Sequence, residues 1–377
     1  MIENNKLRIL HVFGIMDMGG SETLIMNVYR KINLNKIDFN FLVHSSELGH
    51  YDDEIRDKGG HIFYLPRYSG INHFSYKNSV EKFFEEHSKD FDVVHCHIRS
   101  TANIISKYAK KNGLKVILHA HSISNGTGIV SAIKDLFQKK ALKYSDVNIA
   151  CSEDAGIWQF GKQKFTVIHN GIDITKLKFS EKNRSEIRNR YSSDEKIIFG
   201  HVGRFVPEKN HQKIIQLFSE YVKIHPKSEL WLIGEGFLKE VVMKQVDDLS
   251  IGGNVKFLGL IDNIGPYLSA MDIFLFLSKY EGLGISLIEA QCSGLPSLIS
   301  EGIPKESVLN NELVVRLTEE NLVVEGVTSI QKLLSREENR EMAFQYIVDN
   351  DYAINQTIEN LVSIYNTLKE IEEKEWR

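Results

Sequence analysis

The chain contains the stretch Lys279-Tyr280-Glu281-Gly282-Leu283-Gly284-Ile285-Ser286-Leu287-Ile288-Glu289. An apolar run at 272–278 precedes it and is typical of a buried parallel strand. Helix-forming residues follow it at 287–292. The stretch is therefore predicted to be a strand-to-helix turn that contains two glycines. Such turns lie at the carboxyl edge of an open α/β sheet, where ligands bind.

This turn has the features of a site for a phosphorylated sugar. Backbone N–H groups at the start of a helix lack helical partners and attract an anion, here at Gly284, Ile285, Ser286 and Leu287. Glu281 lies before them in the loop, and Glu289 follows in the helix. A carboxylate suits a sugar because it accepts hydrogen bonds from two neighbouring hydroxyls. The alternative is that both glutamates are ordinary solvated charges, as most glutamates are.

Glu281 and Glu289 stand with seven residues between them, inside Tyr280-Glu281-Gly282-Leu283-Gly284 and its continuation. This pattern resembles the signature of retaining GT-B glycosyltransferases, and of glycosyltransferase family four in particular, in its bacterial capsular or exopolysaccharide form. The resemblance implies an α/β fold of two Rossmann-like, doubly wound parallel-sheet domains that face each other across a cleft. It also implies sugar transfer from a nucleotide-sugar donor without a metal ion, with Glu281 at the sugar and Glu289 at the ribose.

The composition is consistent with two domains in an ordinary globular protein. A chain of 377 residues is too long for one typical core. We place the boundary near residue 176, with an acceptor-side domain at 1–176 and a donor-binding domain at 177–352. As in the resembled family, a terminal helix at about 353–377 is expected to pack back on the first domain.

Charge and cysteine content exclude several classes of protein. A net charge of −4 gives no argument for nucleic-acid binding, and three scattered cysteines indicate a reducing compartment. The polar start of the chain and the absence of a long apolar run predict a cytoplasmic protein, at most attached to the inner face of a membrane.

The first half begins with a strand, a glycine turn and a helix. The turn contains Gly19, Gly20 and Glu22, and its spacing imitates a phosphate-binding loop, but Gly20 stands where that loop has its lysine. In the resembled family, a turn of this type lets the first domain approach the donor diphosphate. A plain helix-capping turn explains the same residues equally well.

Alternating strands and helices continue through the first half and predict a parallel, doubly wound sheet. The expected strands are 39–44, 61–65, 92–97, 115–119 and 146–151, and the expected helices are 52–58, 76–87 and 101–111.

Two His-x-His pairs fall at predicted strand ends. Around His95 and His97, the sequence places no second ligand pair that would complete a metal site, so both are interpreted as ordinary sheet residues. In the second pair, the resemblance places a histidine beside the donor sugar, with His121 preferred and His119 as second choice. Core or capping histidines are the alternative.

The second half supplies the cations that the first glycine turn lacks. Arg204 and Lys209 follow a glycine-containing strand end, and positioned cations stabilise a departing diphosphate electrostatically. In the resembled family, the matching residues contact the donor diphosphate. Two further positions, Asn170 in an Asn-Gly-Ile-Asp segment and Gly236 at a later strand exit, are second choices for donor contacts.

A basic amphipathic helix is expected at 126–144. It fits either attachment to an anionic membrane surface near a lipid-linked acceptor, or ordinary packing on the sheet with its lysines in water.

Together these features predict a hexosyl- or N-acetylhexosaminyltransferase that uses a nucleotide-diphosphate sugar, expected to be UDP-linked, and no cofactor or metal. Its acceptor is expected to be a glycan or a lipid-linked saccharide in capsule, exopolysaccharide or cell-surface glycan synthesis. A nucleotide-sugar epimerase and a non-catalytic nucleotide-sugar-binding module remain alternatives. Two Asp-x-Asp pairs, at 90–92 and 349–351, match the spacing of metal-dependent GT-A transferases, but neither ends a strand beside a nucleotide turn, so both are interpreted as turns.

Overall fold

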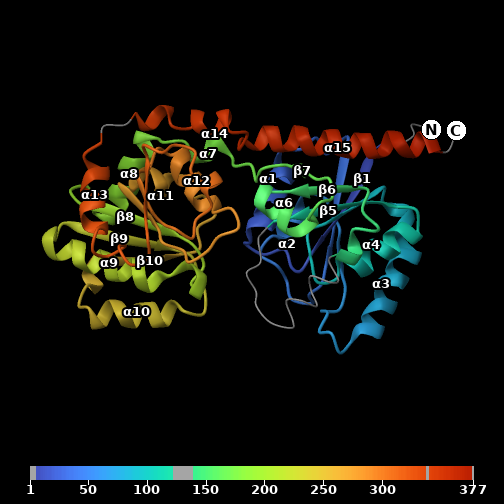
Figure 1. Cartoon of the computed structure of the whole chain (residues 1–377), viewed down its shortest axis with the longest axis horizontal. Helices are drawn as coiled ribbons and strands as arrows, with labels where there is room; N and C mark the ends of the chain where they lie inside the picture. The colour runs from blue at the N-terminus through green and yellow to red at the C-terminus, as the bar shows by residue number, and fades with distance from the viewer. Residues whose placement is uncertain (1–5, 122–138, 337–338, 376–377) are drawn as a thin grey trace. The chain divides into compact units, whose positions relative to one another are not determined.

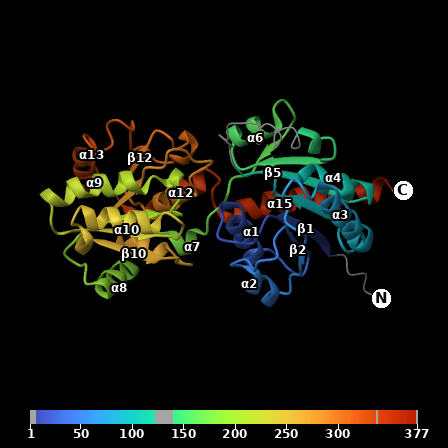
Figure 2. The same ribbon diagram turned by 90° about the horizontal axis from the view of Figure 1, so that it is seen from below.

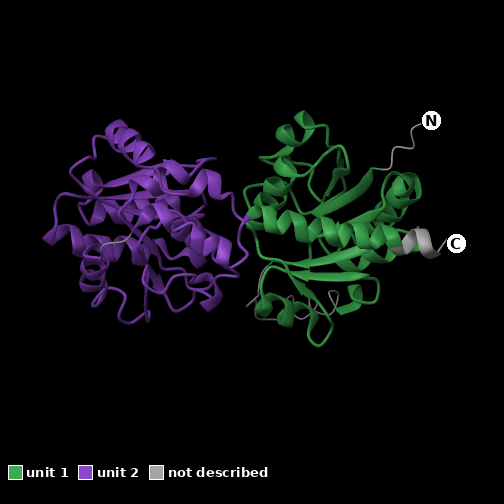
Figure 3. Cartoon of the chain, turned by 90° about the horizontal axis from the view of Figure 1, so that it is seen from above, with its two compact units in different colours: residues 1–171, 354–377 green, residues 172–353 purple. Residues whose placement is uncertain are grey.

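The computed structural model describes residues 6–121, 139–336 and 339–375. The chain divides into two compact units, one formed by Met1–Gly171 with Ile354–Arg377 and the other by Ile172–Ala353 (Figure 3). This division falls slightly before the boundary expected near residue 176. Each unit is an α/β sandwich around one parallel sheet, so the predicted fold class is confirmed.

The first unit contains a seven-stranded sheet in the order β3-β2-β1-β4-β5-β6-β7. Every pairing in this sheet is parallel. Its strands are β1 (Leu7–Phe13), β2 (Ile37–Val43), β3 (Ile62–Tyr64), β4 (Val93–Cys96), β5 (Lys115–Ala120), β6 (Val147–Ala150) and β7 (Thr166–Val167). Its helices are α1 (Gly20–Lys31), α2 (Asp52–Asp57), α3 (His73–His87), α4 (Ala102–Lys111), α6 (Glu153–Phe160) and α15 (Ile354–Glu375).

Alternating side chains divide the core of the first unit between the two faces of the sheet. In β1, Ile9 and Phe13 face a cluster completed by α1 and α15, and Leu10 and Val12 face a cluster completed by α3 and α4. The helices α1 and α15 lie side by side on their face (Figures 1 and 2). The C-terminal helix therefore belongs to the core of the first unit, where Tyr365 is fully buried.

The second unit contains a six-stranded parallel sheet in the order β10-β9-β8-β11-β12-β13. Its strands are β8 (Ile197–Val202), β9 (Ser228–Ile233), β10 (Val255–Gly259), β11 (Ile273–Phe276), β12 (Ser297–Ser300) and β13 (Val314–Leu317). Its helices are α7 (Ile174–Leu177), α8 (Glu181–Tyr191), α9 (His211–Ile224), α10 (Lys239–Asp248), α11 (Gly265–Ala270), α12 (Ile285–Cys292), α13 (Gly326–Leu334) and α14 (Gln345–Asp349). The order reverses next to β8, and such a switch point opens a crevice at the carboxyl edge.

None of the helices within the described residues is both long enough and apolar enough to cross a membrane. Most of the basic segment expected at 126–144 lies outside the described residues, so its helix and its proposed membrane contact stay predictions.

Candidate functional site

The predicted strand-to-helix turn of the second unit is present, between β11 and α12. Gly284 is the residue before the helix and has φ 73° and ψ 49°, a left-handed conformation that glycine adopts without strain. The helix begins at Ile285, so the first backbone N–H groups, at Ile285 and Ser286, have no carbonyl one turn earlier in the helix. These N–H groups lie at the positive end of the helix dipole, so the turn is suited to binding an anion.

Loops after β8 and β11 are tied together at this edge of the sheet. The Lys279 N–H donates to the Glu208 carbonyl at 2.8 Å, and the Tyr280 hydroxyl donates to Glu208 Oε1 at 3.0 Å. In the same region, the Lys209 ammonium lies 2.6 Å from Glu281 Oε1, with both side chains largely buried. The structure therefore brings together a cation and a carboxylate that are far apart in the sequence.

The positive charge of Lys209 also affects the pKa of Glu289, the second carboxylate of the turn. Burial raises the pKa of Glu289 to about 7, and the positive charge of Lys209 opposes that rise. The Lys209 ammonium additionally lies 5.1 Å from the centre of the Phe276 ring, which is buried at the end of β11. Lys209 thus lies in one neighbourhood with both glutamates of the predicted motif.

Arg204 lies on the same loop after β8, and its side chain is exposed. Its backbone is fixed by its neighbours, because the Phe205 N–H donates to the Glu235 carbonyl at 2.9 Å. Gly236 has φ 155°, and a Cβ there would approach the Phe205 carbonyl oxygen to 2.6 Å. A side chain at Gly236 would therefore displace the loop that carries Arg204, which gives this glycine a structural role.

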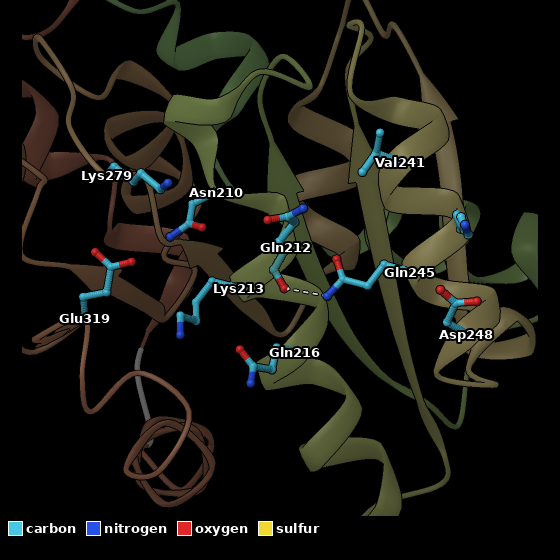
Figure 4. Close-up of a pocket in the computed structure, with 10 residues that line it drawn as sticks. Asn210, Gln212, Lys213, Gln216, Val241, Gln245, Asp248, Lys279 and Glu319 are labelled. Carbon is cyan, nitrogen blue, oxygen red and sulfur yellow. Dashed lines mark hydrogen bonds between the residues drawn. The ribbon is translucent and has the colours of Figure 1, made fainter.

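A pocket of about 610 Å³ lies between α9 and α10, beside this edge (Figure 4). Its lining is mostly polar, and the Gln245 side-chain amide donates to the Gln212 carbonyl across it. Asn210 and Lys279 belong to its rim, but Arg204, Glu281 and Glu289 do not line it. This groove is therefore distinct from the residues predicted to bind the donor at the glycine turn.

In the first unit, the predicted glycine turn is present and begins α1. Gly19 precedes the helix, and its carbonyl accepts from the Thr23 N–H at 2.9 Å. A Cβ on Gly19 would lie 2.2 Å from the carboxylate of Glu22, which folds back over the turn. Gly20 is exposed, and a Cβ there would meet no described atom within 4 Å. Gly19 and Glu22 therefore have a local structural role, whereas packing gives no reason for a glycine at position 20.

Asn170 is buried at the end of the first unit. Among the described residues, its side-chain oxygen has no hydrogen-bond partner. The structure thus gives Asn170 a buried, unpaired acceptor but does not place it beside the glycine turn of α1.

Five histidines gather on the α15-facing side of the first sheet, and sequence reasoning missed this cluster. We call it the histidine cluster, and its members are His11, His95, His97, His119 and His121. Strand alternation directs all five to one face, and the register places His11 opposite His95. The argument that His95 and His97 lack a second ligand pair is therefore wrong, because His119 and His121 on and just after β5 lie beside them.

Hydrogen bonds connect the members of the histidine cluster into two chains. His97 contacts His11 at 3.0 Å through Nε2 and His121 at 2.7 Å through Nδ1. His95 contacts His119 at 3.1 Å through Nε2 and the Tyr365 hydroxyl of α15 at 2.7 Å through Nδ1. Burial lowers the pKa of His11 and His121 to about 3 and the pKa of the other three well below the ordinary value, so the rings are neutral.

Two α/β units, each built on a parallel sheet, together with a glycine turn suited to an anion, two carboxylates and nearby cations, are typical of a GT-B glycosyltransferase. Residues 18–176 match the family model described as Glycosyltransferase Family 4, and residues 183–347 match the model described as Glycosyl transferases group 1. The chain is 30% identical to EpsF of Bacillus subtilis (strain 168), over 97% of this chain and 98% of EpsF. It is 26% identical to the capsular polysaccharide biosynthesis glycosyltransferase CapH of Staphylococcus aureus, over 95% of this chain and 98% of CapH.

Solved structures share the fold. HepE of Anabaena, in a crystal structure in complex with UDP-glucose, superposes with a TM-score of 0.76 at 17% identity, over 96% of this chain and 100% of that one. WaaG, a glycosyltransferase involved in lipopolysaccharide biosynthesis, gives a TM-score of 0.71 at 15% identity, over 95% and 99%. The chain belongs to the group 1 and family 4 glycosyltransferases.

Proposed function

We propose that the chain transfers a hexosyl or N-acetylhexosaminyl unit from a UDP-linked sugar to a lipid-linked saccharide, with retention of anomeric configuration and without a metal ion. The acceptor is a growing capsule, exopolysaccharide or other surface glycan, and the reaction takes place in the cytoplasm at the inner face of the membrane. The names of CapH and of a diphosphoundecaprenol galactosyltransferase of Escherichia coli, 22% identical over 82% of this chain, support this class of acceptor.

The observation that carries the proposal is the position of Lys209 among Glu281, Glu289 and the start of α12. A diphosphate bound at the helix start takes the ammonium of Lys209 as its counter-charge, together with the exposed guanidinium of Arg204. Glu281 then exchanges its ion pair for the hydroxyls of the transferred sugar, and Glu289 accepts from the ribose.

Negative charge grows on the diphosphate as the bond to the anomeric carbon breaks. Preorganised cations and amides stabilise that charge and lower the barrier. The acceptor hydroxyl attacks from the face that the leaving group vacates, and the departing phosphate takes its proton. In this proposal Gly19, Gly20 and His121 of the first unit are donor contacts, and His119, Glu22, Asn170 and Gly236 are the second choices for such contacts.

The test combines purified protein with a panel of nucleotide sugars, first alone and then with a lipid extract from cells making the glycan. Transferase activity is shown by release of UDP that requires both donor and lipid, with the sugar recovered in the lipid fraction. Conversion of the nucleotide sugar without lipid would instead indicate an epimerase. Donor-dependent thermal stabilisation with no turnover would indicate a binding module.

A further inference from the structure

The histidine cluster of the first unit has features that donor contacts by His121 and His119 do not explain. Three of its ring nitrogens are buried and have no hydrogen-bond partner among the described residues: Nε2 of His11, Nε2 of His119 and Nδ1 of His121. A buried polar atom without a partner costs free energy, so the buried Nε2 of His119, which lies among the other rings, calls for a physical reason.

We propose that His97, His119 and His121 bind a divalent transition-metal ion, Zn²⁺ or a similar ion that prefers imidazole. One nitrogen from each of these three rings lies within 4.8 Å of the other two. Three imidazoles with an open fourth position form a well-known zinc ligand set, and imidazole also suits copper, nickel and cobalt.

Distances within the cluster are compatible with such an ion. Bonds of about 2.0 Å in tetrahedral geometry separate two ligand nitrogens by about 3.3 Å. His97 Nδ1 and His121 Nε2 are 2.7 Å apart, so rotations of the rings that move these atoms by a few tenths of an ångström make room. His97 is held for this purpose by Phe13, whose ring stacks on it at 4.2 Å with an interplanar angle of 4°.

The outer contacts of the three ligands are those that metal-binding histidines need. A ligating imidazole usually donates its other N–H to a neighbouring group, which fixes its tautomer. His119 Nδ1 can donate to His95 Nε2, and His95 Nδ1 then donates to the Tyr365 hydroxyl. With the protons in these positions, the lone pair of His119 Nε2 is available to an ion. In the same way, His97 Nε2 can donate to His11 Nδ1, which leaves the lone pair of His97 Nδ1 available.

The access of the site also fits a metal ion. His121 is partly exposed, whereas the other four histidines are buried, so an ion can enter beside His121.

The test uses the full-length, untagged chain after treatment with a chelator and dialysis. Titration with Zn²⁺ in a calorimeter is expected to show one strong site per chain, and Co²⁺ is expected to give the intense visible absorption of a four-coordinate ion. Ligand variants His97→Gln and His119→Gln should abolish both signals. Because His11 is an outer contact, His11→Gln should weaken Zn²⁺ binding by about 10- to 100-fold.

His44→Gln is the matched control, because His44 is buried in the same unit but bonds to the Tyr76 hydroxyl at 3.1 Å on the other face of the sheet. It should bind Zn²⁺ as the unaltered chain does. If a ligand variant does not fold, ring ¹⁵N resonances of the unaltered chain decide instead, since Zn²⁺ must shift those of the three ligands. Absence of a strong site in the unaltered chain, or equal weakening by His44→Gln, would overturn the proposal.

Discussion

Lys209 Nζ lies 2.6 Å from Glu281 Oε1 in the second unit, in a salt bridge between two largely buried side chains. The pair joins the loop after β8 to the loop after β11, and it holds a cation beside the start of α12. A buried pair that loses one partner leaves an uncompensated charge, so neither residue can be exchanged without consequence for the other.

The first prediction concerns the two cations of the loop after β8. Lys209→Ala and Arg204→Ala should each lower kcat by about 10²-fold or more, the usual scale for removing a group that stabilises developing charge. Steady-state rates of lipid-dependent UDP release measure this effect. The Lys209 variant should lose stability as well, because it leaves Glu281 unpaired.

Lys213→Ala is the control for both variants. Lys213 is a cation on α9 that lines the groove beside α10 and not the turn. Its removal should leave kcat unchanged. Rates like those of the unaltered chain in Arg204→Ala and Lys209→Ala would remove both cations from the site.

The second prediction concerns the pH dependence of stability that Glu289 produces. The pKa of Glu289 in the folded chain is raised to about 7, above its ordinary value, so the folded state favours the neutral acid. The contribution of the neutral Glu289 carboxyl group to stability is therefore complete below the ordinary pKa of a glutamate, and it is lost as the pH rises through 7. At about 1.4 kcal/mol per pKa unit, ionisation should cost on the order of 1–3 kcal/mol by about pH 8.

Glu289→Gln removes this titration. In chemical unfolding at about pH 5 and about pH 8, the unaltered chain should lose more free energy of unfolding with rising pH than the variant does. Glu301→Gln changes an exposed glutamate and should follow the unaltered chain. If the free energy of unfolding changed equally with pH in the Glu289 variant and in the unaltered chain, the Glu289 carboxylate would not be desolvated.

The third prediction separates the two glycines at the start of α1. A Cβ at Gly19 would collide with the Glu22 carboxylate, but a Cβ at Gly20 would meet no described atom. Gly20→Ala should therefore not lower the melting temperature, since alanine is a better helix former than glycine. If the donor diphosphate approaches Gly20, the same variant should lower kcat/KM by about tenfold or more, because misplacement by 1 Å can cost about 10²-fold.

Gly253→Ala controls for the substitution itself. Gly253 lies in the second unit, where a Cβ would also meet no described atom within 4 Å, and both its stability and its activity should be unchanged. Full activity of Gly20→Ala would assign this turn to helix capping alone.

The fold was largely predictable from the sequence because both sheets are covered on two faces. Strands of this kind appear as continuous apolar runs, and β1, β4, β5, β8 and β11 were found in that way. The edge strand β13 was missed because it is only partly buried and contains Arg316, whose guanidinium reaches the Ile303 carbonyl. Its sequence therefore lacks the apolar signal of a central strand.

The glycine turn was predictable for a different reason, because a left-handed residue favours glycine, as at Gly284 before α12. Two other features depend on which strands are neighbours, which one sequence does not state. The Lys209–Glu281 pair needs β8 beside β11, and the histidine cluster needs β1, β4 and β5 in register. His-x-His on two strands of one sheet is the signal that could have identified the cluster, had the two pairs been considered together.

The last prediction concerns the role of metal ions in catalysis. If Lys209, Arg204 and the start of α12 neutralise the diphosphate, lipid-dependent transfer should continue at an undiminished rate in excess EDTA. The assay compares UDP release with EDTA, with EDTA followed by excess Mn²⁺ or Mg²⁺, and with neither. Mn²⁺ and Mg²⁺ prefer oxygen ligands, so loss of activity that these ions restore would mean that a cation bridges the phosphates and would contradict the metal-independent mechanism. Restoration by Zn²⁺ but not by Mg²⁺ would instead indicate the nitrogen ligands of the histidine cluster, because borderline-soft ions prefer imidazole.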